Sequence, residues 1–154
     1  MRPWALILGL VTSACSQDPG VPKLRSEIIL RLAHSRDTIR VGESDTITVT
    51  ATNNFGDRVS IRFPNACPVF AYIRDPRGNI VAPANGWTCL PVVTTITMAK
   101  DESRDFLFVW AGRSEFAGGL QPQPLPPGEY FGTATMQAGS FIVHSPPVRV
   151  ILAP

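Results

Sequence analysis

The histidines and serines are the first residues to consider for catalysis. The chain has two histidines, His34 and His144, and each directly precedes a serine, Ser35 or Ser145. Nucleophilic catalysis requires a serine and a histidine whose side chains face each other, with an acid that orients the imidazole. Adjacency in sequence does not meet that requirement. We therefore expect both histidines at solvated or edge positions, and we predict no catalytic residue, no cofactor and no enzymatic activity.

The three cysteines offer a different kind of chemistry. Cys67 and Cys89 lie 22 residues apart, and in an exported chain they would meet oxidising conditions. We predict a disulfide between them, which would stabilise the fold by about 3 kcal/mol through chain entropy. The alternative is that the two thiolates bind a metal. That site needs further soft or imidazole ligands nearby, and because the sequence shows none we predict no metal.

The third cysteine, Cys15, ends a segment built like a bacterial export signal. Arg2 precedes an apolar run from Trp4 to Val11, which is too short to cross a membrane because a span takes about 20 residues. The segment resembles the lipobox of lipoproteins, whose cysteine is lipidated after cleavage. We expect residues 1–14 to be a signal peptide, Cys15 to carry lipid, and residues 15–26 to form a flexible tether. The alternative is plain cleavage after Ser16, which would give a secreted or periplasmic soluble protein.

Length and charge limit the possible partners. The chain has 154 residues and a formal net charge of +2, and its basic residues are scattered singly. This length suits one domain, and scattered charges do not form the basic stripe that binds phosphates. We predict no nucleic-acid partner.

From residue 27 onward every segment has the pattern of a β-strand. The clearest is 46–52, in which Ile47, Val49 and Ala51 alternate with threonines and define a core face. The strongly apolar segment 106–110 is expected in the middle of a sheet. The pattern predicts one all-β domain over 27–154, an antiparallel immunoglobulin-like β-sandwich of about 8–10 strands. The predicted strands are 27–32, 38–41, 46–52, 59–63, 69–74, 80–82, 92–99, 106–110, 130–136 and 148–152.

The segment from Leu125 to Tyr130 has the strongest local signature. Pro127 and Gly128 suit the two central positions of a type II turn, where glycine takes a positive φ. Tyr130 then opens a strand and is placed to return its hydroxyl to upstream backbone, as in a tyrosine corner. We assign Pro127, Gly128 and Tyr130 a structural role.

Three stretches together resemble the intracellular proteinase inhibitor (BsuPI) domain family. They are the strand–turn–strand run 48–63, the strand 70–75 with Gly78, and the strand 106–110 followed by the corner that contains Tyr130. The resemblance covers roughly residues 44–137. It implies a β-sandwich that inhibits a serine proteinase through an extended loop. The reactive residues of the family are not attached to a motif found in this chain, so none is carried over.

Two segments are candidates for contact with a protein partner. The connection 111–126 is rich in glycine and proline and contains Phe116 and Leu120 as lone apolar residues. Loops of this length without secondary structure are usually functional or disordered. The second segment, 65–90, is closed by the predicted disulfide and contains Trp87. Alternatively, Phe116 caps the end of the sandwich and Trp87 is a buried plug.

These observations predict a non-enzymatic binding module of the cell envelope, attached to the membrane through lipid on Cys15. Its partner would be a protein, and the family resemblance makes a serine proteinase the sharper form of this hypothesis. The alternative is a structural or assembly accessory lipoprotein of an envelope complex.

Overall fold

A computed structural model describes residues 27–154 of the chain. The predicted signal peptide, the lipidation of Cys15 and the tether over 15–26 lie outside the described residues. The described part consists of eleven strands. They are β1 (Ile28–His34), β2 (Thr38–Arg40), β3 (Asp45–Asn53), β4 (Val59–Phe63), β5 (Val69–Arg74), β6 (Ile80–Ala82), β7 (Thr94–Met98), β8 (Ser103–Trp110), β9 (Gly128–Ala138), β10 (Phe141–His144) and β11 (Val148–Ala153).

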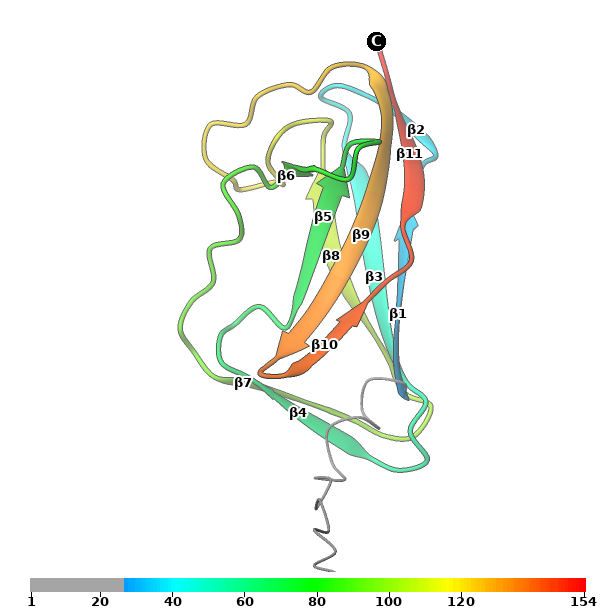
Figure 1. The fold of residues 1–154 in the computed structure, drawn as a ribbon, viewed down its shortest axis with the longest axis vertical. Coiled ribbons are helices and arrows are strands. Elements are labelled where there is room, and N and C mark those ends of the chain that lie inside the picture. Colours follow the sequence, from blue (N-terminus) through cyan, green and yellow to red (C-terminus); the bar gives the residue numbers. More distant parts are fainter. Residues whose placement is uncertain (1–26) are drawn as a thin grey trace, which may run out of the picture.

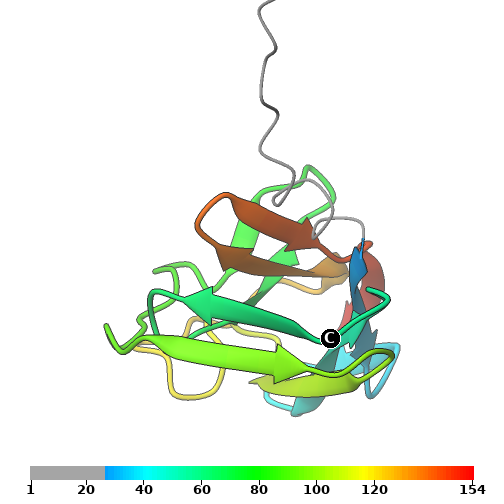
Figure 2. The same ribbon diagram turned by 90° about the horizontal axis from the view of Figure 1, so that it is seen from below.

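The strands form a β-sandwich, as predicted (Figure 1). One sheet has the order β1-β3-β8, and the other has the order β2-β11-β9-β5-β6 with β10 paired to β9. Every pairing is antiparallel except the short parallel ladder between β11 and β2. The remaining two strands, β4 and β7, pair with each other and cross the lower end of the molecule in Figure 1, which is the end that faces the viewer in Figure 2. In residues 27–154 no helix is long and apolar enough to span a membrane.

The core forms where the inward faces of the two sheets meet. Ile47, Val49 and Ala51 of β3 are fully buried, which confirms the core face predicted for this strand. Met136 of β9 and Val150 of β11 are fully buried as well. Because successive side chains of a strand point to opposite faces, the threonines of β3 lie half-buried on the outer face.

Two strands differ from the sequence prediction. β8 was expected in the middle of a sheet, but it is the last strand of its sheet. Its side chains Phe106 and Phe108 pack against the core, whereas Leu107 on the opposite face is 67% exposed. An edge strand with one buried aromatic face has the same apolar composition as a central strand, so composition alone does not separate the two cases. The short strand β10 was not predicted; it pairs with β9 across a turn at Gly139.

The segment before β9 forms the predicted tyrosine corner, but its backbone conformation differs from the predicted type II turn. The Tyr130 hydroxyl donates a hydrogen bond to the Pro126 carbonyl at 2.7 Å, and burial raises the pKa of this tyrosine. Gly128 does not take a positive φ and is already the first residue of β9. The predicted type II turn over Pro127 and Gly128 is therefore wrong, because the strand ladder to β11 starts at Gly128 itself.

The start of the described chain and the connection between β8 and β9 lie at opposite ends of the sandwich, and the connection between β6 and β7 runs along one side from the upper part to the lower end (Figure 1). Ile28 opens β1 at the lower end of Figure 1. The connections from β6 to β7 and from β8 to β9 approach each other at the upper left. All three residues predicted to contact a partner lie on these two connections.

Candidate functional site

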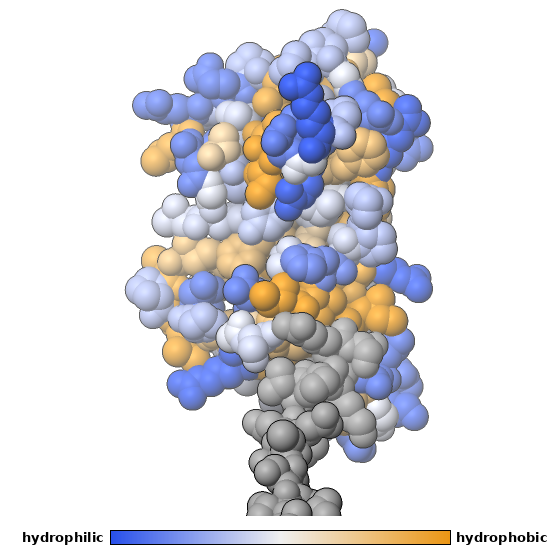
Figure 3. All heavy atoms as spheres, in the orientation of Figure 1, coloured by the Kyte–Doolittle hydropathy of each residue, from blue (hydrophilic) through white to orange (hydrophobic). Residues whose placement is uncertain are grey.

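Trp87, Phe116 and Leu120 line one pocket with a volume of about 490 Å³. The first comes from the connection between β6 and β7, and the other two come from the connection between β8 and β9. The structure thus brings together all three residues that the sequence singled out for partner contact. The surface around these connections exposes both hydrophilic and hydrophobic side chains (Figure 3).

The long connection 111–126 is held by backbone hydrogen bonds over much of its length. The Ser114 amide donates to the Gln123 carbonyl at 2.8 Å, and the Leu125 amide donates to the Gly112 carbonyl at 3.0 Å. The Ala84 amide donates to the Ser114 carbonyl at 2.8 Å and thereby joins the two walls of the pocket. Backbone that is paired in this way gives the pocket preformed walls.

Trp87 packs between the two sheets and lines the pocket. Its indole Nε1 donates to the Ala71 carbonyl of β5 at 2.9 Å. Its ring meets that of Phe108 of β8 edge-on, with centroids 5.4 Å apart. Trp87 therefore bridges β5 of one sheet and the edge strand β8 of the other, which is the plug role considered from sequence, while it also lines the pocket.

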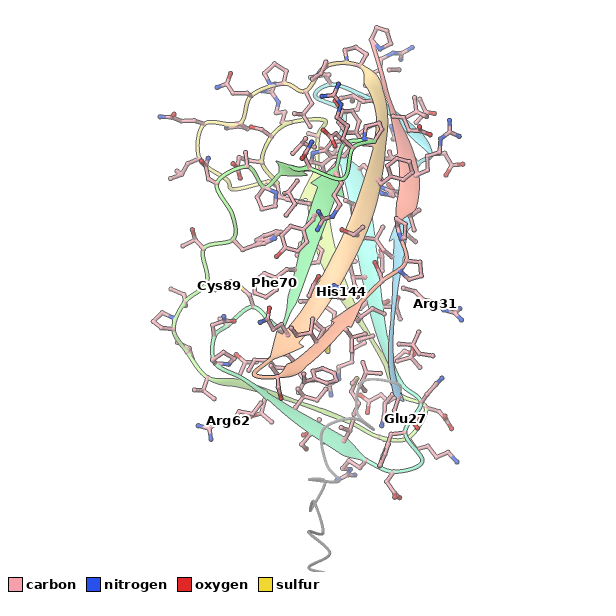
Figure 4. All side chains as sticks on the ribbon, viewed as in Figure 1. Glu27, Arg31, Arg62, Phe70, Cys89 and His144 are labelled. Atoms are coloured by element: carbon pink, nitrogen blue, oxygen red, sulfur yellow. A yellow bond between two sulfur atoms is a disulfide. The ribbon has the colours of Figure 1, made fainter. Side chains whose placement is uncertain are left out.

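The disulfide is formed between Cys67 and Cys89, with their Cα atoms 5.8 Å apart. Figure 4 places Cys89 on the connection between β6 and β7, two residues after Trp87. The bridge ties this connection to the segment before β5, so the wall that contains Trp87 is held from both sides.

Phe116 and Leu120 play different parts in the opposite wall. Phe116 is 6% exposed, forms an isolated β-bridge with Trp110, and lies against Trp87 with ring centroids 5.1 Å apart. It caps the sandwich and lines the pocket at once. Leu120 is 80% exposed at the tip of the loop, between Gly118 at φ +87° and Gln121 at φ +51°. It lies at the exposed rim of the pocket.

Glu115 is a pocket residue that the sequence analysis missed. Its side chain is buried, with the residue 5% exposed. Its Oε1 accepts hydrogen bonds from the Asn85 backbone amide at 3.0 Å and from the Asn85 side-chain amide at 2.8 Å. A single glutamate in a polar loop gives no sequence signal of burial. The one available indication is the apolar neighbour Phe116, which is buried as well.

A second buried carboxylate, Asp45, lies outside the pocket. Its Oδ2 is 2.5 Å from His34 Nδ1, and its Oδ1 accepts hydrogen bonds from the Ser35 amide at 2.9 Å and the Ser35 hydroxyl at 2.7 Å. The side chains of His34 and Asp45 are 1% and 0% exposed. His34 ends β1, an edge strand of its sheet, as one of the two predicted alternatives has it; the other alternative, a solvated position, is wrong because the side chain is buried. β1 and β3 pair up to His34, which places its ring beside Asp45 at the start of β3.

Gly132 of β9 makes room for the buried imidazole. A Cβ atom at this position would lie 2.5 Å from His34 Nε2 and 3.0 Å from Leu32 Cδ2. The Nε2 atom is buried and has no hydrogen-bond partner among residues 27–154. It faces packed backbone rather than a cavity, so this histidine is sealed inside the sandwich.

The other residues considered for chemistry are not assembled with the pocket. His144 Nδ1 lies 3.0 Å from the Thr135 hydroxyl on the paired strand β9 (His144 is labelled in Figure 4). The Ser145 hydroxyl accepts from the Ala134 amide and donates to the Pro146 carbonyl. Among the described residues no group of three or more His, Cys, Asp or Glu side chains is placed to hold a metal ion.

No protein-family model matches the chain, and no curated protein matches it. Among solved structures, the sporulation control protein Spo0M of Bacillus subtilis is similar over 83% of this chain and 50% of its own, with 12% identity and a TM-score of 0.51. The CARDB domain of the PF1109 protein of Pyrococcus furiosus has 15% identity and a TM-score of 0.46, over 82% of this chain and 88% of that one. A β-glucosidase of Listeria innocua has 14% identity and a TM-score of 0.47; this chain covers 16% of it. At such identities, the likeness to Spo0M concerns the fold alone.

Proposed function

We propose that this protein is a non-enzymatic binding module of the bacterial cell envelope, and that it docks a protein partner at the pocket between residues 83–88 and 115–120. The observation that supports this proposal is the meeting of Trp87, Phe116 and Leu120 around one preformed cavity. A concave apolar site with a few convergent polar groups is the usual form of a binding site. Aromatic anchors in such a site commonly supply most of the binding energy.

The pocket favours binding over catalysis. Glu115 is its one titratable side chain, and acid–base catalysis on glycosidic bonds or similar substrates uses a pair of groups. Neither His34 nor His144 lines it. Leu120 supports a macromolecular partner, because an 80% exposed leucine at the rim offers apolar area beyond the pocket itself.

The envelope location rests on the export signal and on the disulfide. Disulfides form and persist outside the reducing cytosol, so the Cys67–Cys89 bridge supports an exported protein. Attachment through lipid on Cys15 is tested by Cys15→Ala, which should release the protein from membranes; retention after this change would contradict the anchor.

Docking at the pocket is tested by a photo-crosslinking amino acid at Thr88, an exposed residue of the pocket wall. In cells that produce the full chain, we expect one discrete adduct with an envelope protein. Leu120→Asp should abolish it, whereas Leu107→Asp should leave it intact, because Leu107 is 67% exposed on β8 and does not line the pocket. An adduct that survives Leu120→Asp, or no adduct at all, would overturn the proposal.

Inhibition of a serine proteinase is the narrower form of this proposal and derives from the resemblance to the BsuPI family. The tip around Leu120 is the part of the connection exposed enough to enter a proteinase cleft. The protein should then inhibit a subtilisin-like proteinase stoichiometrically. Full proteinase activity at micromolar protein, with cleavage within 111–126, would dispose of this form and leave the docking proposal in place.

A further inference from the structure

We infer that the pocket recognises a positively charged side chain, a lysine or an arginine, of the protein partner. This inference rests on the proposed function and names the chemistry of its anchor. Glu115 is 5% exposed and forms no ion pair with the residues that the structure describes. Buried carboxylates are otherwise paired or coordinate metals, because an isolated buried charge is costly.

The hydrogen bonds of Glu115 leave one side of its carboxylate open. The backbone N–H and the side-chain NH2 of Asn85 each donate one hydrogen bond to Oε1. No described residue donates to Oε2, and Oε2 is not among the buried side-chain atoms that lack a partner, so it is accessible from the pocket. Asn85 thus fixes the orientation of the carboxylate, and the second oxygen keeps its capacity to accept charged donors. A bound ammonium or guanidinium would supply them.

Gly119 keeps the loop close to this carboxylate. A Cβ atom at Gly119 would lie 2.6 Å from Glu115 Cβ and 3.1 Å from Oε2. The loop therefore folds over Glu115 only because glycine stands at this position, and the carboxylate remains in the wall of the pocket rather than being displaced outward.

The aromatic residues suit the same ligand. Trp87 and Phe116 line the pocket with Glu115, and the indole is held in place by its bond to Ala71. A cation beside an aromatic face and a desolvated carboxylate gains from both interactions. A side chain with a long aliphatic stem, as in lysine or arginine, would place its methylene groups on the rings and its charge on Glu115.

Two other ligand classes fit the pocket less well. A sugar needs several free donors and acceptors for its hydroxyl groups, but the Trp87 indole N–H, the Asn85 backbone N–H and one hydrogen of the Asn85 side-chain amide are already used. A divalent cation takes six or more oxygen ligands as Ca²⁺, or near-ideal octahedral geometry as Mg²⁺, whereas Glu115 is the one carboxylate of the pocket. One negative charge with apolar surroundings matches one organic cation.

The test uses small probes on the full chain, followed by NMR through the Trp87 indole N–H signal. We expect Nα-acetyl-lysine methylamide and the arginine equivalent to shift this signal, and the neutral norleucine equivalent to leave it unchanged. Glu115→Gln should weaken the lysine or arginine probe at least tenfold. Glu129→Gln is the matched control, because Glu129 pairs with Arg149 on the surface and does not line the pocket.

The outcomes separate this inference from the proposed function. Equal binding of norleucine and lysine probes, or unchanged binding in Glu115→Gln, would overturn cation recognition. A shift caused by N-acetylglucosamine alone would assign the pocket to carbohydrate and overturn it too. If the Thr88 adduct persists in Glu115→Gln but disappears in Leu120→Asp, docking stands and the cationic anchor falls.

Discussion

Asp45 and Glu115 are both buried carboxylates, and they differ in how completely the fold satisfies them. Asp45 has donors on both oxygens, from His34 and from Ser35. Glu115 has both of its donors, from Asn85, on one oxygen and faces a pocket with the other. The hydrogen bonds around Asp45 stabilise the sandwich and leave neither carboxylate oxygen without a protein donor. Those around Glu115 leave charge and space for a ligand, and this contrast is what separates a structural polar cluster from a candidate site.

The largest expected effect comes from removing the satisfied carboxylate. Asp45→Ala leaves the buried His34 ring and the Ser35 amide without their acceptor and should lower the free energy of unfolding by about 3 kcal/mol. Urea titration at neutral pH measures it. Asp105→Asn is the control, because Asp105 is exposed and bonds only Thr50, and it should change stability by less than about 0.5 kcal/mol. Equal effects of the two changes would contradict the structural role.

The next effect tests whether the imidazole is sealed in. Gly132→Ala would place a methyl group 2.5 Å from His34 Nε2, and overpacking of this kind should cost about 2 kcal/mol. Gly56→Ala, where nothing lies within 4 Å, should be nearly neutral. In a double-mutant cycle, His34→Ala with Gly132→Ala should cost clearly less than the sum of the single changes. Additive costs would show that the ring is free to move away.

At acidic pH the free energies of unfolding of the wild type and of Asp45→Ala should become more similar. Burial raises the pKa of Asp45, but the hydrogen bonds from His34 and Ser35 and the charge of His34 outweigh burial and hold this pKa below its ordinary value of 3.8. A lowered pKa in the folded state gives stability that is complete above the unfolded pKa and is lost as pH falls through the folded pKa. Unfolding titrations from pH 6 to pH 2 should show the gap closing below about pH 4. A gap independent of pH would contradict the assignment.

The smallest effect on the free energy of unfolding is expected at Glu115, whose carboxylate accepts hydrogen bonds on one oxygen. In Glu115→Gln the side-chain oxygen still accepts both Asn85 hydrogen bonds, and no described ion pair is lost. The free energy of unfolding should change by less than about 0.5 kcal/mol in the same urea titration. A loss as large as that of Asp45→Ala would make Glu115 a structural residue and remove the contrast between the two clusters.

Local sequence patterns predicted the scaffold well because each depends on neighbours along the chain. The alternation over 46–52 identified the core face of β3, and the pairing of Cys67 with Cys89 followed from their number and the expected compartment. The neighbours of a strand in its sheet are set by contacts distant in sequence. For that reason β8 was misplaced at the centre of a sheet.

The site was predicted in part, for a related reason. Phe116 and Leu120 were predicted as lone apolar residues of the 111–126 connection, and Trp87 as part of the segment closed by the disulfide; all three line one pocket. Glu115 was missed and the burial of His34 was not predicted, because burial of a polar residue depends on partners elsewhere in the chain: Asn85 for Glu115, and Asp45 with Gly132 for His34. No pattern within a single strand or loop encodes those partners.

The start of β1 and the 115–120 loop lie toward opposite ends of the long axis of the sandwich, and this affects how the domain would be oriented at a bilayer. Ile28 begins β1 at the lower end of Figure 1, whereas the loop that contains 115–120 lies in the upper part, with the beginning of the connection from β6 to β7 beside it. An acyl chain on a residue upstream of Ile28 would keep the lower end near the headgroups. The pocket beside Leu120 would then lie in the half of the domain that is farther from the lipid.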